Sequence, residues 1–193
     1  MARFLLANVA AELLAIMLLT EICLSLQLDK LSFIWGFFLA ETDVMYFLDI
    51  SGCLPHRYKI VIAGNHDLGF DDSEDLNLRG MSYRGRGTPQ GYKLLTNSSF
   101  DEIGMIGKQL SVVYGIRIYG SSWHPLPGYS FSRERGQPLL DKWNLIPEGI
   151  DVLVTHSPPL GHSDNFKGTR WGCSELLNTV EYRVKPLFHV FGH

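Results

Sequence analysis

The chain has 193 residues, with 17 basic and 20 acidic side chains and a net charge of −3, so it is long enough for one domain with a sizeable core. This near-neutral balance excludes a nucleic-acid binder held by a basic patch, and we expect no strong nucleic-acid binding. The three cysteines lack C-x-x-C spacing and cannot all pair. They favour a reduced, cytoplasmic protein over a disulfide scaffold.

Residues 1–46 differ from the rest of the chain, and we expect them to form an apolar leader that is mainly helical and poorly attached to the domain. Its apolar stretch, residues 4–26, is interrupted by Glu12 and Glu21, which would lie on opposite faces of a helix. Because an acid near the bilayer centre costs about 2.5–3.5 kcal/mol, a membrane anchor is the less favoured interpretation. A signal peptide remains an alternative.

From Tyr58 onward the sequence alternates between strand and helix patterns. Three short apolar runs predict buried strands at 58–64, 151–156 and 186–193. Residues 111–120 predict two strands that are joined at Tyr114-Gly115. Two helices are predicted at 137–147 and 174–184, and a long loop is predicted at 71–92. This alternation predicts an α/β domain.

Each of the three predicted buried strands ends at a polar residue. Asn65 directly follows the first strand, and His156 and His193 are the last residues of the second and third. In open α/β sheets the ligand site lies outside the carboxyl ends of the strands, so these side chains are expected to converge. One amide oxygen and two imidazoles suit a divalent cation such as Mn²⁺, Fe²⁺ or Zn²⁺.

The motifs "GNHD", "THSPP" and "GH", in this order, resemble those of the calcineurin-like metallophosphoesterases. Longer stretches such as "LPHRYKIVIAGNHDLGFD" and "KPLFHVFGH" are similar to the subgroup called metallophosphoesterase-domain-containing proteins. The resemblance covers residues 47–193. It implies a sandwich of two mixed sheets flanked by helices, here incomplete at both ends.

The resemblance also implies an activity, the metal-dependent hydrolysis of phosphoesters, with phosphodiesters or cyclic nucleotides as substrates. By position, Asn65, His156 and His193 correspond to ligands of the second of two metal ions. His66 corresponds to the histidine that stabilises the transition state or protonates the leaving oxygen. Asp67 stands where an acidic residue would orient His66.

Three further residues lie on loops that the family places near the substrate: His124, His162 and Asp164. The alternative is a surface position for the two histidines and a solvated loop for Asp164. His189 and Cys173 are expected to be buried residues of the core rather than ligands.

The chain also departs from the family pattern. No D-x-H and no Gly-Asp pair occurs upstream of Asn65, and the last x-H of G-H-x-H is missing after His193. We do not expect Asp43 or Asp49 to replace these ligands. One metal site is therefore expected to be retained, with impaired catalysis. The alternative is a catalytically silent relative, or truncated product, that binds a metal or a nucleotide.

Overall fold

A computed structural model gives the fold of residues 3–6, 31–35, 58–65, 103–105 and 110–192. The larger of its two main sheets is mixed, with strand order β1-β10-β7-β6-β5, and only the β5–β6 pair is antiparallel. Its strands are β1 (Arg3–Leu6), β10 (Phe188–Phe191), β7 (Val152–Thr155), β6 (Ile116–Ser121) and β5 (Leu110–Val113).

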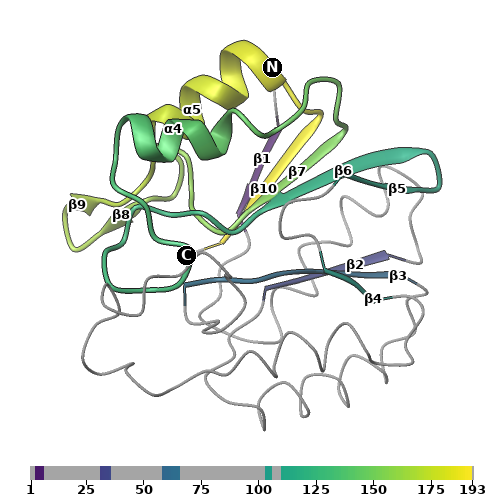
Figure 1. Ribbon diagram of the computed structural model, residues 1–193, viewed down its shortest axis with the longest axis horizontal. Helices are drawn as coiled ribbons and strands as arrows, with labels where there is room; N and C mark the ends of the chain where they lie inside the picture. The colour runs from purple at the N-terminus through teal and green to yellow at the C-terminus, as the bar shows by residue number, and fades with distance from the viewer. Residues whose placement is uncertain (1–2, 7–30, 36–57, 66–102, 106–109, 193) are drawn as a thin grey trace, which may run out of the picture.

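The second sheet has the order β2-β3-β4, and its three described strands are parallel. They are β2 (Leu31–Trp35), β3 (Tyr58–Ile62) and β4 (Ile103–Met105). Figure 1 shows this sheet below the larger sheet, with the helices α4 and α5 on the opposite side of the larger sheet. The arrangement confirms the predicted calcineurin-like sandwich of two sheets with helices outside.

The two predicted helices are confirmed, with differences at their ends. The first, α4 (Gln137–Trp143), ends before the predicted limit at residue 147. The second begins as α5 (Ser174–Asn178) and continues as a π-helical segment, η2 (Thr179–Val184). The Arg183 guanidinium donates to the carbonyl oxygens of Trp143 and Ile146, both at 2.7 Å, and so ties η2 to the end of α4.

The two faces of the larger sheet carry different partners. Because successive side chains of a strand point to opposite faces, Tyr119 and Leu153 share one face while Ile118 and Val152 share the other. Tyr119 and Leu153 belong to a core cluster that also contains the helix residues Leu139, Trp143, Leu176 and Val180. The opposite face looks toward the second sheet, where Ile60 and Ile62 are buried as well.

The prediction of a poorly attached helical leader is wrong for the parts of residues 1–46 that the structure describes. β1 pairs in parallel with β10, with Phe4 opposite His189, and β2 pairs in parallel with β3. Apolar composition alone does not distinguish a buried helix from a buried strand in a central sheet. The boundary placed at residue 46 stays a prediction, and the segment 7–30, Asp43 and Asp49 lie outside the described residues.

The predicted turn between β5 and β6 is confirmed. Tyr114 and Gly115 have φ values of 52° and 83°, and a type I′ hairpin turn requires positive φ at both central residues. The predicted loop at 71–92 lies outside the described residues. Within the described ranges, no helix has the length and apolar character needed to cross a membrane.

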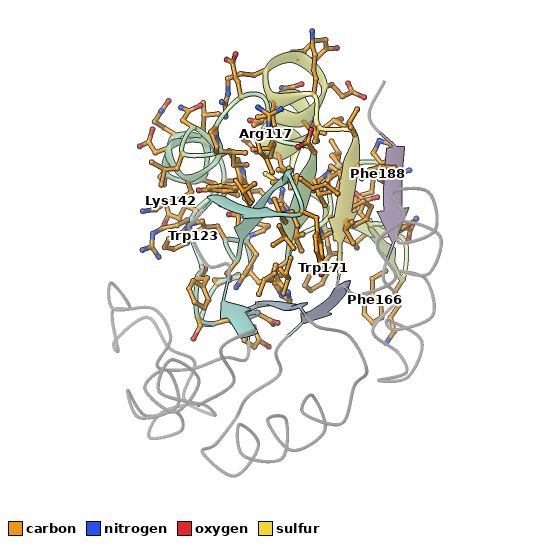
Figure 2. All side chains as sticks on the ribbon, turned by 90° about the vertical axis from the view of Figure 1, so that its right-hand side faces the viewer. Arg117, Trp123, Lys142, Phe166, Trp171 and Phe188 are labelled. Atoms are coloured by element: carbon orange, nitrogen blue, oxygen red, sulfur yellow. The ribbon has the colours of Figure 1, made fainter. Side chains whose placement is uncertain are left out.

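β6 leads into Trp123, which is fully buried between the sheet and the loop that follows. Its ring meets the ring of Phe131 edge to face at 5.7 Å, and the Lys142 ammonium lies 4.4 Å from its centroid. Figure 2 shows Lys142 and Trp123 on the same side of the molecule. These contacts fix the start of the segment that carries His124.

Candidate metal centre

Two of the predicted ligands meet where β3 and β7 end. The Asn65 side-chain oxygen Oδ1 lies 3.0 Å from His156 Nε2, and both residues are buried. Each residue directly follows the apolar stretch that predicted its strand. The expected proximity of Asn65 and His156 is therefore confirmed, while their role as ligands stays a prediction.

The three strands that precede the proposed ligands do not all lie in one sheet. β7 and β10 are adjacent and parallel in the larger sheet, but β3 belongs to the second sheet. Asn65 and His156 meet across the gap between the two sheets, at their carboxyl ends. His156 lies on the face that looks toward the second sheet, because Thr155 before it points to the opposite face and contacts His189.

The distance between Asn65 Oδ1 and His156 Nε2 fits two ligands of one cation. Two ligand atoms that each lie about 2.1 Å from a cation, at a right angle, are about 3.0 Å apart. The Asn65 backbone N–H also donates to His156 Nε2 at 3.2 Å, which requires a lone pair on that nitrogen. Oδ1 lies within hydrogen-bond distance of the same nitrogen, and the ring tautomer decides whether Nε2 accepts from the Asn65 N–H or donates to Oδ1.

His66, Asp67 and His193 lie outside the described residues. The residue before His193 is bonded to β7, because the Gly192 N–H donates to the Thr155 carbonyl oxygen at 3.4 Å. This bond continues the β7–β10 pairing to the residue next to His156. Within the described ranges, no three His, Cys, Asp or Glu side chains come together as a metal site.

His124 occupies a buried position rather than the surface position given as the alternative. Its Nδ1 accepts the Leu126 N–H at 3.0 Å, so the proton is on Nε2, which donates to the Ser130 carbonyl oxygen at 2.5 Å. Its ring packs edge to face on His156 at 5.6 Å. A direct substrate contact would break one of these bonds, so His124 is better suited to hold the His156 ring in place.

Asp164 is also buried, where a solvated loop was the alternative. Its Oδ1 pairs with the Arg170 guanidinium at 2.6 Å, and its Oδ2 accepts the N–H groups of Gly161 at 3.1 Å and Gly172 at 3.2 Å. Burial raises the pKa of the Asp164 carboxyl, but these bonds outweigh burial and leave the pKa below its usual value. Asp164 thus organises the loop after β7, on which the half-buried His162 also lies.

Replacing Asp164 with asparagine should lower the free energy of unfolding by about 1–3 kcal/mol at pH 7, since the bonds to a charged acceptor are lost. The lowered pKa of Asp164 stabilises the fold at pH values above about 3.9, the unfolded value. This stabilisation disappears as the pH falls through the folded-state pKa. Urea unfolding at pH 7 and at about pH 2, well below the unfolded value, should show a smaller difference between variant and wild type at the lower pH. The exposed Asp141→Asn is the control, and an equal loss in both variants would contradict the assignment.

The expectations for His189 and Cys173 are confirmed. His189 Nε2 lies 2.9 Å from the Thr155 hydroxyl, and burial lowers the pKa of His189 to about 3. The Cys173 sulfur accepts the Trp143 indole N–H at 3.3 Å, and burial raises the Cys173 pKa to about 11. Both residues belong to the core on the helix side of the sheet.

The sequence analysis missed β4 and also the hairpin of β8 (Asn165–Phe166) and β9 (Thr169–Arg170). Its central residues Lys167 and Gly168 have φ values of 50° and 83°. The Lys-Gly pair between the dipeptides Asn-Phe and Thr-Arg was the available signal, but strands of two residues give no periodicity to detect.

The family description "Calcineurin-like phosphoesterase" matches residues 35–193. A UPF0046 protein of Caenorhabditis elegans is 50% identical over an alignment of 157 residues, which covers 78% of this chain and 54% of the relative. The human "Metallophosphoesterase domain-containing protein 1" is 47% identical over an alignment of 164 residues, which covers 79% of this chain and 49% of the relative. The chain thus spans about half the length of these curated relatives.

A solved crystal structure shares the fold, with a TM-score of 0.53 at 12% sequence identity. The alignment covers 100% of this chain and 84% of the solved chain.

Proposed function

The chain belongs to the calcineurin-like phosphoesterase family, and on this premise we propose that it binds a divalent cation and hydrolyses phosphoesters with it. The proposed substrates are phosphodiesters or cyclic nucleotides. Mn²⁺, Fe²⁺ and Zn²⁺ suit the mixed oxygen and nitrogen ligands.

The observation that carries the proposal is the 3.0 Å contact between Asn65 Oδ1 and His156 Nε2. The two residues come from different sheets and are 91 positions apart in the chain, yet both are buried at the carboxyl ends of their strands. An amide oxygen and an unprotonated imidazole nitrogen at this distance can bind one divalent cation together. His193, which follows the placed Gly192, is the proposed third ligand.

A cation held there would neutralise charge on the phosphoryl oxygens and acidify the attacking water. The other steps fall to the chain's own residues. We assign His66 the delivery of a proton to the leaving oxygen and Asp67 the orientation of His66. The His124 ring, fixed by its bonds to Leu126 and Ser130, keeps the His156 ring in its orientation.

The second candidate function is metal or nucleotide binding without efficient catalysis. The observation that favours it is that residues 1–64 contain neither D-x-H nor Gly-Asp. In the family pattern these two motifs supply the ligands of the first metal ion. A single cation offers only part of the charge stabilisation that two cations give.

The 193-residue chain is expected to hydrolyse bis-p-nitrophenyl phosphate with Mn²⁺ at least about 10²–10³-fold more slowly than a family member that carries both motifs. The reason is that removing even one preorganised charge-stabilising group typically reduces the rate by this factor. Metal content of the purified chain and turnover with and without chelator are the measurements. Turnover equal to that of the intact member would contradict the expectation, whereas metal binding without turnover would favour the second candidate.

A further inference from the structure

The residue after β6, Ser122, is a buried serine whose hydroxyl makes no hydrogen bond within the described ranges. The residue is 0% exposed. Nearly all buried polar side chains in folded proteins have a partner, because an unpaired one lowers stability. A buried hydroxyl without a protein partner therefore points to a bound water or ion as its partner.

Ser122 lies beside His156, on the face of the larger sheet that looks toward the second sheet. Ser121 pairs with Thr155 in the β6–β7 register, and the His156 N–H donates to the Ser121 carbonyl oxygen at 3.0 Å. The next residues of the two strands are thus neighbours, about 4.8 Å apart. Thr155 before them and Trp123 after them contact the helix side, so Ser122 and His156 share the opposite face.

The segment that follows Ser122 fixes both proposed ligands. The His124 ring packs edge to face on His156 at 5.6 Å. Ser130 bonds to His124 through its carbonyl oxygen, and its N–H donates to the Asn65 carbonyl oxygen at 3.2 Å. The buried hydroxyl of Ser122 therefore belongs to the same fixed cluster as the two ligands.

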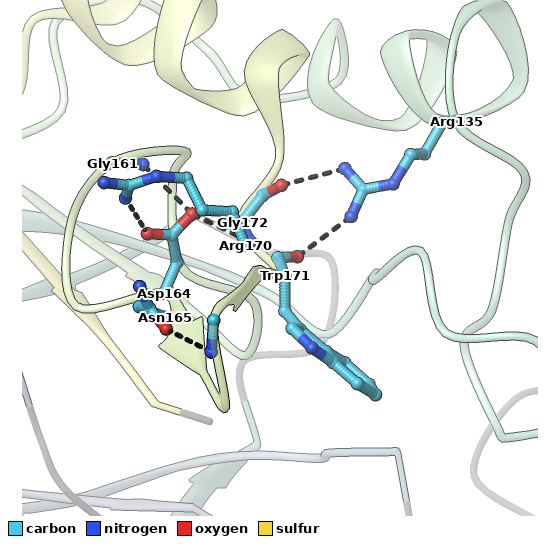
Figure 3. Close-up of polar contacts among 8 residues, drawn as sticks. Arg135, Gly161, Asp164, Asn165, Arg170, Trp171 and Gly172 are labelled. Carbon is cyan, nitrogen blue, oxygen red and sulfur yellow. Dashed lines mark hydrogen bonds and ion pairs between the residues drawn. The ribbon is translucent and has the colours of Figure 1, made fainter.

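The loop that follows β7 is fixed as well. The Asp164 carboxylate accepts the N–H groups of Gly161 at 3.1 Å and Gly172 at 3.2 Å, as Figure 3 shows. The Cys173 N–H donates to the carbonyl oxygen of Pro158, two residues after the histidine ligand, at 3.0 Å. A site whose neighbouring segments are fixed in this way can hold a bound oxygen atom in one position.

A cation bound by Asn65 and His156 needs more ligands than the chain provides. With His193 as the proposed third ligand, a tetrahedral cation still has one position for water, and Mn²⁺ with a higher coordination number has more. A buried water typically makes about three hydrogen bonds to polar groups that otherwise have no partner. The Ser122 hydroxyl, which can donate and accept, is such a group beside His156.

From this juxtaposition we propose that the Ser122 hydroxyl holds a water ligand of the cation that Asn65 and His156 bind. Ser122 is a positioning residue, because it acts on the cation through this water. The inference rests on the proposed function, since it takes the cation to be bound at Asn65 and His156. Groups that orient the ligands of a metal ion typically change its affinity by about 10–100-fold.

The test measures Mn²⁺ binding to the full 193-residue chain by isothermal titration calorimetry, which needs no turnover. Ser122→Ala should weaken Mn²⁺ affinity about 10-fold. The matched control is Ser121→Ala, which removes the same side chain one residue earlier, on the opposite face of the sheet. It should leave the affinity within about twofold of the wild type.

Thermal unfolding with and without Mn²⁺ separates this role from a purely structural one. Without metal, Ser122→Ala should be at least as stable as the wild type, because in the part of the chain that the structure describes its hydroxyl has no hydrogen bond to lose. With the same excess of Mn²⁺, the melting temperature of Ser122→Ala should rise less, since stabilisation by a ligand depends on its affinity.

Equal Mn²⁺ affinities of the wild type and Ser122→Ala would overturn the inference and leave the proposed metal site intact. A loss of affinity that comes with lower stability of metal-free Ser122→Ala would also overturn it, because the hydroxyl would then support the fold. An equal loss in Ser121→Ala would do the same. Absence of Mn²⁺ binding by the wild type would refute the inference together with the proposed metal site, whereas Ser122-dependent binding without hydrolysis would count against the proposed catalysis alone.

Discussion

Replacing His156 with alanine is expected to weaken Mn²⁺ binding by the 193-residue chain at least about 100-fold. Loss of residues that only orient a ligand typically weakens metal affinity by about 10–100-fold, and His156 is proposed to contribute the ligand atom itself. Its Nε2 is the atom that lies 3.0 Å from Asn65 Oδ1. Isothermal titration with Mn²⁺, with circular dichroism to confirm folding, gives the measurement.

His162→Ala is the matched control for this experiment. His162 lies on the loop that follows His156, so the same type of side chain is removed from the same segment. Its metal affinity should remain within about twofold of the wild type, since mutations outside such a site usually have small effects. Equal losses in both variants, or no loss in His156→Ala, would refute the assignment of His156 as a ligand.

Trp143→Ala is expected to lower the free energy of unfolding by about 3–5 kcal/mol, the usual effect of truncating a fully buried large aromatic side chain. Trp143 has no solvent exposure and lies in the cluster between the helices and the larger sheet. Its indole N–H also donates to the Cys173 sulfur, so α4 loses its link to the start of α5. Thermal unfolding should show a midpoint roughly 6–20 °C lower.

Trp171→Ala provides the comparison for stability, because it removes the same side chain from a more exposed position. Its free energy of unfolding should change by no more than about 0.5–1 kcal/mol. If Trp143→Ala were as stable as Trp171→Ala, the core between the helices and the sheet would not be packed as described.

Local sequence patterns were sufficient for most elements after residue 110. The turn at Tyr114-Gly115, the strand β7 and the helix that begins at Ser174 all agree with the structure. Each depends on interactions within a few residues, such as the φ > 0 requirement of a tight turn or the apolar face of a helix. The small hairpin β8–β9 was missed because its strands are too short to show a period.

Long-range pairing could not be read in the same way. The segments 3–6 and 31–35 form strands because β10 and β3 lie beside them and complete their backbone hydrogen bonds. An apolar run offers the same burial in a helix as in a strand, so the choice depends on which partner is present. The prediction of a helix in these two segments failed for this reason.

The sequence by itself determined that Asn65 and His156 stand at the carboxyl ends of buried strands, and the expectation that the two side chains lie close together agrees with the structure. It also determined that His189 and Cys173 would be buried, since both stand within apolar patterns. Only the tertiary structure decided that β3 and β7 belong to different sheets and that the two side chains meet across the gap between them. It likewise decided that Asp164 is buried, because its partners Arg170 and Gly172 come together only when the hairpin folds back on the loop after β7. Strand ends follow from local periodicity, whereas strand partners and buried ion pairs follow from contacts between distant residues.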